Sequence, residues 1–128
     1  MIEPKFYICR KCGNLVGMIE ASGVIMKCCG EPMEELIPGT VDASLEKHLP
    51  VVEVNGNEIT VTVGSVIHPM TEEHHIAWIY LLTENGGQRK VLEHTGEPVA
   101  KFILAEGEKP VAAYEYCNLH GLWKTDIQ

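Results

Sequence analysis

The sequence has no apolar run that approaches the roughly 20 residues needed to span a bilayer, so it predicts no membrane helix. It is also poor in basic side chains, with 10 Lys and Arg against 18 Asp and Glu and a net charge of -8. A nucleic-acid partner requires a basic face, and this balance argues against one. The first residues lack the basic and apolar regions of a secretory signal, so we expect a cytoplasmic protein.

An even set of cysteines is also missing. The chain has 5, which fits a disulfide scaffold poorly and favours thiolate ligation of a metal. Four of them lie within residues 1–36, as Cys9-x-x-Cys12-Gly13 and as the adjacent pair Cys28-Cys29. A segment this short buries too little apolar surface to be stable alone, and four thiolates around one ion would staple it. Adjacent cysteines in a strand point to opposite sides, so this pair must lie in a turn. Both zinc and iron are compatible with such a site.

No convincing long helix is present, and residues 42–128 have the pattern of a β-domain. Residues 59–63 alternate with period two, and residues 51–54 precede them across Asn55-Gly56-Asn57, which predicts a hairpin. The remaining predicted strands are residues 76–82, 88–93, 99–105 and 111–116. Pro38-Gly39 predicts a short, stiff linker at residues 37–41. The expected fold class is all-β: a small metal-binding domain, then an antiparallel, immunoglobulin-like sandwich of about seven strands.

A second metal site is predicted in the larger domain. Cys117 and His120 are three residues apart and are closed by a glycine, so a thiolate and an imidazole can turn back on one ion. Three more histidines, His48, His68 and His74, lie in segments expected to be loops at one end or edge of the sandwich. Strand alternation places His74 and the next residue, also a histidine, on opposite faces, so only one of the two can face the site. His94 is interpreted as a solvated surface side chain.

These motifs resemble known families. Cys9-x-x-Cys12 with the adjacent Cys28-Cys29 resembles desulforedoxin, a small iron protein related to rubredoxin. Residues 64–70, with His74 six residues beyond His68, and residues 117–123 resemble superoxide reductase, and residues 46–48 are similar to its substrate-loop motif. The whole chain therefore resembles desulfoferrodoxin, the two-iron form of superoxide reductase. A histidine at position 75, where an aromatic residue is common, is a departure that touches no expected ligand.

The resemblance implies a domain order and two iron ions. Residues 1–36 would be a desulforedoxin-like (rubredoxin-related) iron-binding domain, 37–41 a linker and 42–128 the catalytic domain. The resemblance assigns one iron to four thiolates and the other to a plane of four imidazoles with an axial sulfur, leaving one position open. The implied ligands are Cys9, Cys12, Cys28 and Cys29 for the first iron and His48, His68, His74, His120 and Cys117 for the second.

The resemblance also implies a reaction, in which superoxide, one electron and two protons give hydrogen peroxide. A thiolate opposite the open position would donate electron density towards a bound oxygen species. Lys47 would attract the superoxide anion and orient a water that delivers a proton, and Glu46 would bind the oxidised iron. Rubredoxin or a similar carrier would restore the electron, no organic cofactor is expected, and a homodimer is expected.

Three other functions compete with this interpretation. A non-haem oxygenase more often uses two histidines and one carboxylate, which leaves room for both substrate and oxygen. A non-catalytic electron carrier would have a closed second metal site. A zinc-stapled binding module would be colourless, so the visible spectrum separates it from both iron proteins.

Overall fold

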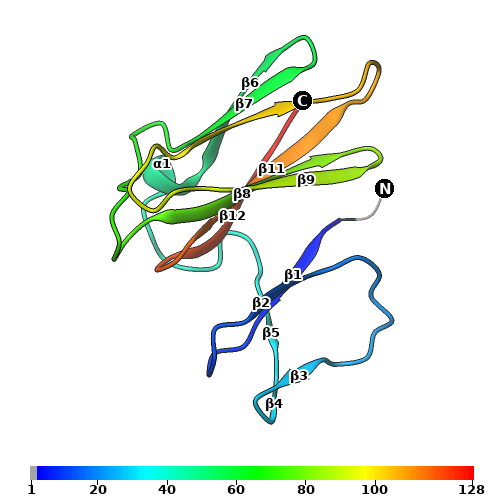
Figure 1. Cartoon of the computed structure of the whole chain (residues 1–128), viewed down its shortest axis with the longest axis vertical. Helices are drawn as coiled ribbons and strands as arrows, with labels where there is room; N and C mark the ends of the chain where they lie inside the picture. Colours follow the sequence, from blue (N-terminus) through cyan, green and yellow to red (C-terminus); the bar gives the residue numbers. More distant parts are fainter. Residues whose placement is uncertain (1–2) are drawn as a thin grey trace. The chain divides into compact units, whose positions relative to one another are not determined.

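The computed structural model describes residues 3–128, which form two compact units (Figure 1). The first unit ends at Ile37, and the second runs from Pro38 to Gln128. Both are built from antiparallel strands, and the one helix among the described residues is α1, Leu45–His48. The predicted all-β fold class is therefore confirmed. No helix within residues 3–128 combines the length and apolar character of a membrane span.

The first unit has a small sheet and a separate hairpin. In the sheet, β1 (Lys5–Ile8) lies between β2 (Leu15–Met18) and β5 (Glu34–Glu35). The hairpin pairs β3 (Lys27–Cys28) with β4 (Glu31–Pro32). Within residues 3–37, few apolar side chains are buried; they are Phe6, Ile8, Cys9 and Leu36. Such a small core is consistent with the prediction that a metal has to stabilise this unit.

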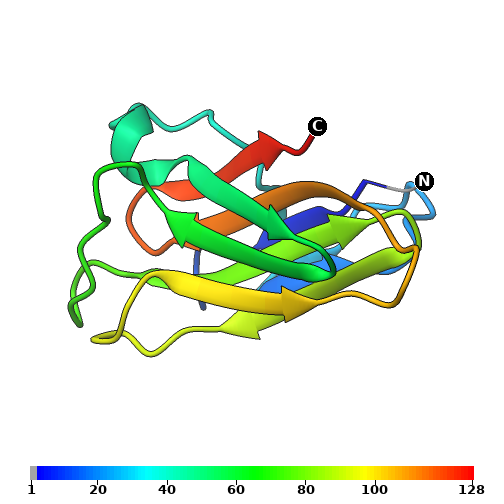
Figure 2. The ribbon, with the colours of Figure 1, turned by 90° about the horizontal axis from the view of Figure 1, so that it is seen from above.

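The second unit consists of two antiparallel sheets (Figure 2). One sheet has the order β10 (Val99–Ile103), β7 (Glu58–Val63), β6 (Pro50–Asn55). The other has the order β12 (Gly121–Asp126), β11 (Pro110–Cys117), β8 (Ile76–Thr83), β9 (Gly86–Val91). Alternate residues of β7 are buried, as the period-two pattern predicts. They join side chains of β8, β10 and β11 in one apolar core, which includes Ile59, Val61, Ile79, Leu81, Phe102 and Ala113.

Two elements of the second unit were not predicted from the sequence. Residues 46–50 were expected to form a loop, but Leu45–His48 make one helical turn, in which the amide of Leu49 donates to Leu45 O at 2.9 Å. One turn is too short to show a helical period. The strand β12 was also missed, because it is a partly exposed edge strand that contains Lys124 and Thr125 and so lacks a continuous apolar signal.

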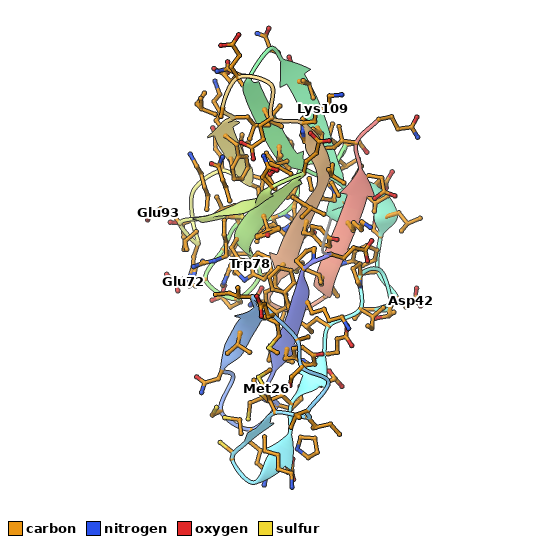
Figure 3. The ribbon with its side chains drawn as sticks, turned by 90° about the vertical axis from the view of Figure 1, so that its right-hand side faces the viewer. Met26, Asp42, Glu72, Trp78, Glu93 and Lys109 are labelled. Carbon is orange, nitrogen blue, oxygen red and sulfur yellow. The ribbon has the colours of Figure 1, made fainter. Side chains whose placement is uncertain are left out.

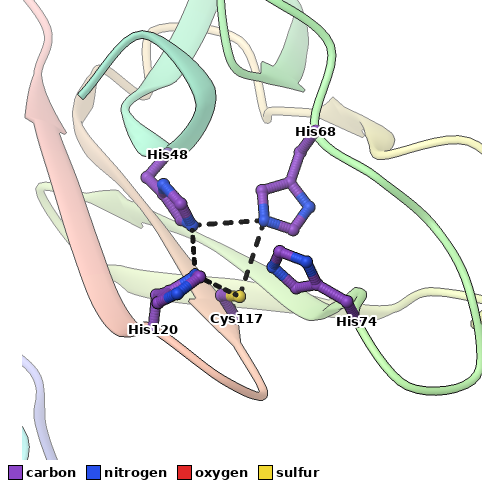
Figure 4. A group of neighbouring side chains, drawn as sticks. All are labelled: His48, His68, His74, Cys117 and His120. Carbon is purple, nitrogen blue, oxygen red and sulfur yellow. Dashed lines mark hydrogen bonds between the residues drawn. The ribbon is translucent and has the colours of Figure 1, made fainter. Parts of the chain in front are cut away.

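The topology brings three distant segments to one end of the sandwich (Figure 1, Figure 4). These segments are α1, the connection between β7 and β8, and the turn between β11 and β12. The labelled residues Glu72, in that connection, and Lys109, just before β11, lie towards opposite ends of the second unit (Figure 3). The sheets thus serve as the rigid support of a loop-built site.

Candidate metal centres

Five of the predicted side chains come together at this end of the second unit. His48 comes from α1, His68 and His74 from the connection between β7 and β8, and Cys117 and His120 from the β11–β12 turn (Figure 4). One donor atom from each of the five lies within 4.8 Å of all the others. Residues up to 72 positions apart in the chain therefore present nitrogen and sulfur to one small space.

The outer nitrogens of two imidazoles are held by backbone carbonyl oxygens. Nδ1 of His48 lies 2.7 Å from Ser44 O, and Nδ1 of His68 lies 2.7 Å from Pro69 O. A carbonyl oxygen can only accept, so each Nδ1 carries the proton and each Nε2 is left with a lone pair. This arrangement, in which a second hydrogen bond fixes the tautomer, is typical of histidines that bind metals.

The ring nitrogens that point into the group lie close to one another, as they would around a bound cation. Nε2 of His48 lies 3.2 Å from Nε2 of His68 and 3.0 Å from Nδ1 of His120. Nε2 of His74 is buried and has no hydrogen-bond partner among the described residues. Lone pairs that face each other, together with a buried unpartnered nitrogen, are unfavourable unless a positive ion lies between them. The residues present therefore fit a metal ion.

Burial keeps three of these imidazoles in the neutral form that binds metals. Desolvation lowers the pKa of His68 to about 4 and also lowers the pKa of His48 and His74. For Cys117, burial raises the pKa of the thiol, the amides of Leu119 and His120 lower it by donating to the sulfur, and the neighbouring Glu115 raises it.

The turn that carries Cys117 and His120 is a three-residue hairpin loop closed by Gly121. Cys117 pairs with Gly121, whose φ of +80° is the left-handed conformation expected at the end of such a loop. Within this loop the amides of Leu119 and His120 donate to the Cys117 sulfur, whereas the amide of Asn118 donates to His75 O at 3.2 Å.

Trp123 supports two of the imidazoles, and sequence reasoning gave it no role. Its indole Nε1 donates to His120 O at 3.0 Å, and its ring lies 5.1 Å from that of His48 with an interplanar angle of 30°. It is almost fully buried. Its place two residues after a Cys-x-x-His-Gly motif was the available signal, but its contact with α1 could not be read from the sequence.

The predicted residues Glu46 and Lys47 lie on α1 with exposed side chains. The backbone carbonyl of Glu46 accepts from Val66 N at 3.0 Å and from Ser65 Oγ at 3.2 Å, which ties α1 to the segment before His68. The positive charge of Lys47 contributes to the lowered pKa of His48, after burial and other causes. Lys47 is therefore close enough to act electrostatically on the group.

The four cysteines of the first unit form the second candidate centre. Their sulfur atoms lie within 4.8 Å of one another, and all are free thiols. Sγ of Cys28 lies 3.6 Å from Sγ of Cys12 and 3.9 Å from Sγ of Cys29. A tetrahedral ion with metal–sulfur bonds of about 2.3 Å requires sulfur atoms about 3.8 Å apart. The spacing thus fits one tetrahedral metal, and it is far too long for a disulfide.

A turn explains how adjacent cysteines face the same point. Cys28 pairs with Glu31, so Cys29 and Gly30 are the two central residues of the β3–β4 hairpin. Both have positive φ, 54° and 78°, as in a type I′ turn. The amide of Cys12 lowers the pKa of Cys9 to about 6, whereas the neighbouring Cys12 and Cys9 raise the pKa of Cys29 to about 12. Four thiols this close need a cation before all can ionise.

The two remaining histidines of the domain lie outside the group. His75 is buried, and its ring stacks on that of His94 with centroids 3.7 Å apart and an angle of 13°. His94, interpreted from the sequence as merely solvated, is about half exposed and also lies 3.6 Å from Glu72 Oε2. The structure therefore brings His74 to the metal group and directs His75 elsewhere.

The chain is similar to proteins of known family. The family model for desulfoferrodoxin matches residues 40–126. The desulfoferrodoxin of Nitratidesulfovibrio vulgaris is 45% identical over 124 residues, covering 97% of each chain. The superoxide reductase of Pyrococcus horikoshii is 41% identical over 100 residues, covering 65% of this chain and 87% of its own. The crystal structure of the superoxide reductase from Treponema pallidum aligns with a TM-score of 0.83 at 45% identity, covering 98% of this chain and 100% of that one.

Proposed function

The chain belongs to the desulfoferrodoxin family, and from this premise we propose that it is a superoxide reductase. The reaction takes one superoxide ion, one electron and two protons to one hydrogen peroxide. The observation that carries the proposal is the convergence of four imidazoles and one thiol within 4.8 Å. An iron ion that takes six ligands would keep one position for a small molecule beside these five protein donors, which a catalytic metal needs and a closed structural site lacks.

Two iron ions per chain belong to this function. The four cysteines of the first unit would hold one, and the group of four histidines and Cys117 would hold the other. When bound, the second iron supplies the electron that reduces superoxide. The sulfur of Cys117 accepts hydrogen bonds from the amides of Leu119 and His120. Together with the neutral imidazoles, it is suited to hold ferrous iron without occupying every coordination position.

Lys47 is proposed to attract superoxide and assist proton delivery, and Glu46 is proposed to bind at the substrate position. The chain carries a net charge of -8, so superoxide needs local positive charge to approach. The ammonium group of Lys47 is exposed beside the histidine group and would attract the anion and hold a water that delivers a proton. Glu46 is proposed as a carboxylate that takes the substrate position in the resting, oxidised protein.

The proposal also covers the domain boundaries and the electron donor. We propose residues 1–36 as the desulforedoxin-like domain, 37–41 as the linker and 42–128 as the catalytic domain. Rubredoxin or a similar small carrier would return one electron per turnover. A cytoplasmic location is proposed as well, supported by five free cysteines, which a reducing compartment preserves.

A homodimer is proposed on the basis of exposed apolar side chains in the first unit. Ile19, Val24 and Ile25 have exposed fractions of 92%, 78% and 70%, which is costly for a small unit in water. A second copy of the chain would cover them. Sedimentation equilibrium should give twice the chain mass, and the Ile19→Ser and Ile25→Ser changes should shift the equilibrium towards monomer.

The test is to mix the reduced protein with a pulse of superoxide and follow iron oxidation and peroxide yield. We expect one hydrogen peroxide for each superoxide consumed. A dismutase would need two superoxide ions for each peroxide, and a pure electron carrier would leave superoxide to its spontaneous decay. The Cys117→Ser variant should lose the fast oxidation while the four-cysteine centre keeps its absorption. Fast, stoichiometric reduction by that variant would refute the role of the thiolate.

A further inference from the structure

We propose that Asn118 is a positioning residue for His74, because its amide locks the Cys117 hairpin to the loop that presents this imidazole. The inference rests on the proposed metal centre and concerns a side chain that is not itself a metal donor. Cys117 and His74 come from segments more than 40 positions apart, and the strand pairing that brings these segments together ends at Cys117 and Ile76, short of His74. Asn118 follows Cys117 directly and reaches that loop.

Three hydrogen bonds connect Asn118 to the residues on both sides of His74. The side-chain Oδ1 accepts from His75 N at 2.9 Å, and Nδ2 donates to Glu73 O at 2.9 Å. The backbone amide of Asn118 donates to His75 O at 3.2 Å. One residue of the hairpin thus grips the peptide groups immediately before and after His74.

The ring of His74 lacks the hydrogen bond that fixes the rings of two other histidines of the group. His48 and His68 each have Nδ1 fixed by a backbone carbonyl, whereas neither ring nitrogen of His74 has a hydrogen-bond partner among the described residues. The backbone of His74 is closed into a turn, in which its amide donates to Thr71 Oγ1 at 3.0 Å and its carbonyl oxygen accepts from Thr71 N at 2.9 Å. The β8–β11 ladder ends at the pair of Cys117 with Ile76, and beyond that pair Asn118 connects this turn to the hairpin of Cys117.

An asparagine suits this task because its amide offers a donor and an acceptor in one plane. Asn118→Asp keeps the acceptor for His75 N but places a carboxylate oxygen against Glu73 O, where a donor was. Asn118→Ala removes both side-chain bonds and keeps the backbone bond. Asn85→Ala, in the exposed β8–β9 turn, is a matched control that removes an asparagine side chain far from the group in sequence.

The experiment measures ferrous and cobaltous ion affinity of the histidine–cysteine group in the full-length protein, by competition with a chelator. We expect Asn118→Ala to weaken binding by about 10- to 100-fold, the usual effect of losing a group that orients a metal ligand. Asn118→Asp should weaken it similarly, and Asn85→Ala should not. The absorption band for charge transfer from the Cys117 thiolate to its metal should shift in both Asn118 variants. The absorption of the four-cysteine centre should stay unchanged and serves as an internal reference.

A double-mutant cycle tests the route through His74. In a His74→Ala background, adding Asn118→Ala should cause little further loss of metal affinity, because the imidazole that Asn118 positions is already gone. An undiminished further loss would overturn the proposed route. So would wild-type affinity and an unshifted band in properly folded Asn118→Ala and Asn118→Asp proteins. If the wild-type group bound no iron at all, the proposed function would fail instead, so the two failures are distinguishable.

Discussion

At the scale of single residues, burial keeps four ionisable side chains of the second metal group neutral: His48, His68, His74 and Cys117. Cys117 is fully buried, and desolvation raises the pKa of its thiol against the effect of two donated amides. The imidazoles of His48, His68 and His74 have lowered pKa values for the same reason. A metal ion reverses this balance, because it ionises the thiol and binds neutral imidazoles. Metal binding and proton release should therefore be coupled at this end of the fold.

Glu115 is a buried acid next to this group. It is fully buried on β11, neither carboxylate oxygen has a hydrogen-bond partner among the described residues, and burial raises its pKa to about 9. Since its pKa in the unfolded chain is near 4.5, the folded protein holds a proton that the unfolded chain has lost between these pH values. Its contribution to stability is present below pH 4.5 and is lost as pH rises towards 9.

We predict that Glu115→Gln is more stable than the wild type at pH 8, on the order of 3 kcal/mol, because the amide has no proton to lose. Near pH 4.5 the two proteins should differ little. Chemical unfolding of the metal-loaded protein at a series of pH values measures this. Glu106→Gln, at an exposed position, is the control and should leave the pH slope unchanged. Parallel pH profiles for wild type and Glu115→Gln would contradict the prediction.

Lys47 should act through its charge. We predict that Lys47→Ala reacts more slowly with superoxide, by roughly 10-fold, and that its rate depends less on ionic strength. Lys109→Ala removes the same charge towards the other end of the unit (Figure 3) and should react at nearly the wild-type rate. Pulse measurements at several salt concentrations compare the three proteins. Equal slopes for Lys47→Ala and wild type would remove Lys47 from the steering of substrate.

At the scale of elements, the site depends on a close approach between α1 and the segment after β7. Gly64 has a φ of +88°, and a Cβ at this position would lie 2.4 Å from Val66 O, 2.6 Å from Glu46 O and 2.7 Å from Lys47 Cα. Only glycine fits such a contact between backbones. Because His48 ends α1 and His68 follows this segment, the contact also sets the distance between two imidazoles.

We predict that Gly64→Ala destabilises the protein by about 2–4 kcal/mol and weakens metal retention, because α1 must move away from the β7–β8 connection. Gly107→Ala is the matched control. Its φ of +82° carries the same conformational penalty, but its Cβ would meet nothing within 4 Å, so only about 1 kcal/mol should be lost. Chemical unfolding and iron content measure both effects. Equal losses for the two variants would show that the close approach is unimportant.

At the scale of the whole molecule, each unit has its own candidate metal centre. The four cysteines all lie in the first unit, and the four histidines and Cys117 all lie in the second. The second unit has the larger apolar core, built from both of its sheets, and the first has few buried apolar residues. The first unit should therefore depend on its metal for stability more than the second does.

We predict that Cys12→Ser loses the iron of the first unit but keeps most of the superoxide reductase activity, because no ligand of the second group comes from residues 1–37. Absorption by the tetrathiolate iron should disappear while the histidine–cysteine centre remains. The superoxide pulse assay gives the activity. Complete inactivation of a variant that still holds the second iron would show that the first centre is obligatory for turnover.

Local sequence determined the donor types and much of the β-structure. Cys9-x-x-Cys12 and the Cys117–His120 pair are short-range features, since a few residues of backbone dictate whether their donors can face one ion. Period-two alternation in residues 59–63 likewise identified a strand whose alternate residues are buried. The identity of the family followed from the spacing of these same residues.

Tertiary structure decided which residues hold the donors in place. The stacking of His75 on His94 and the hydrogen bonds of Asn118 to the His74 loop both depend on contacts between segments far apart in sequence. The support that Trp123 gives to His48 is of the same kind. The local sequence pattern specifies a residue's conformational preferences and the face of its strand on which its side chain lies. Its neighbours across the fold are set only when the sheets pack and bring the loops to one end.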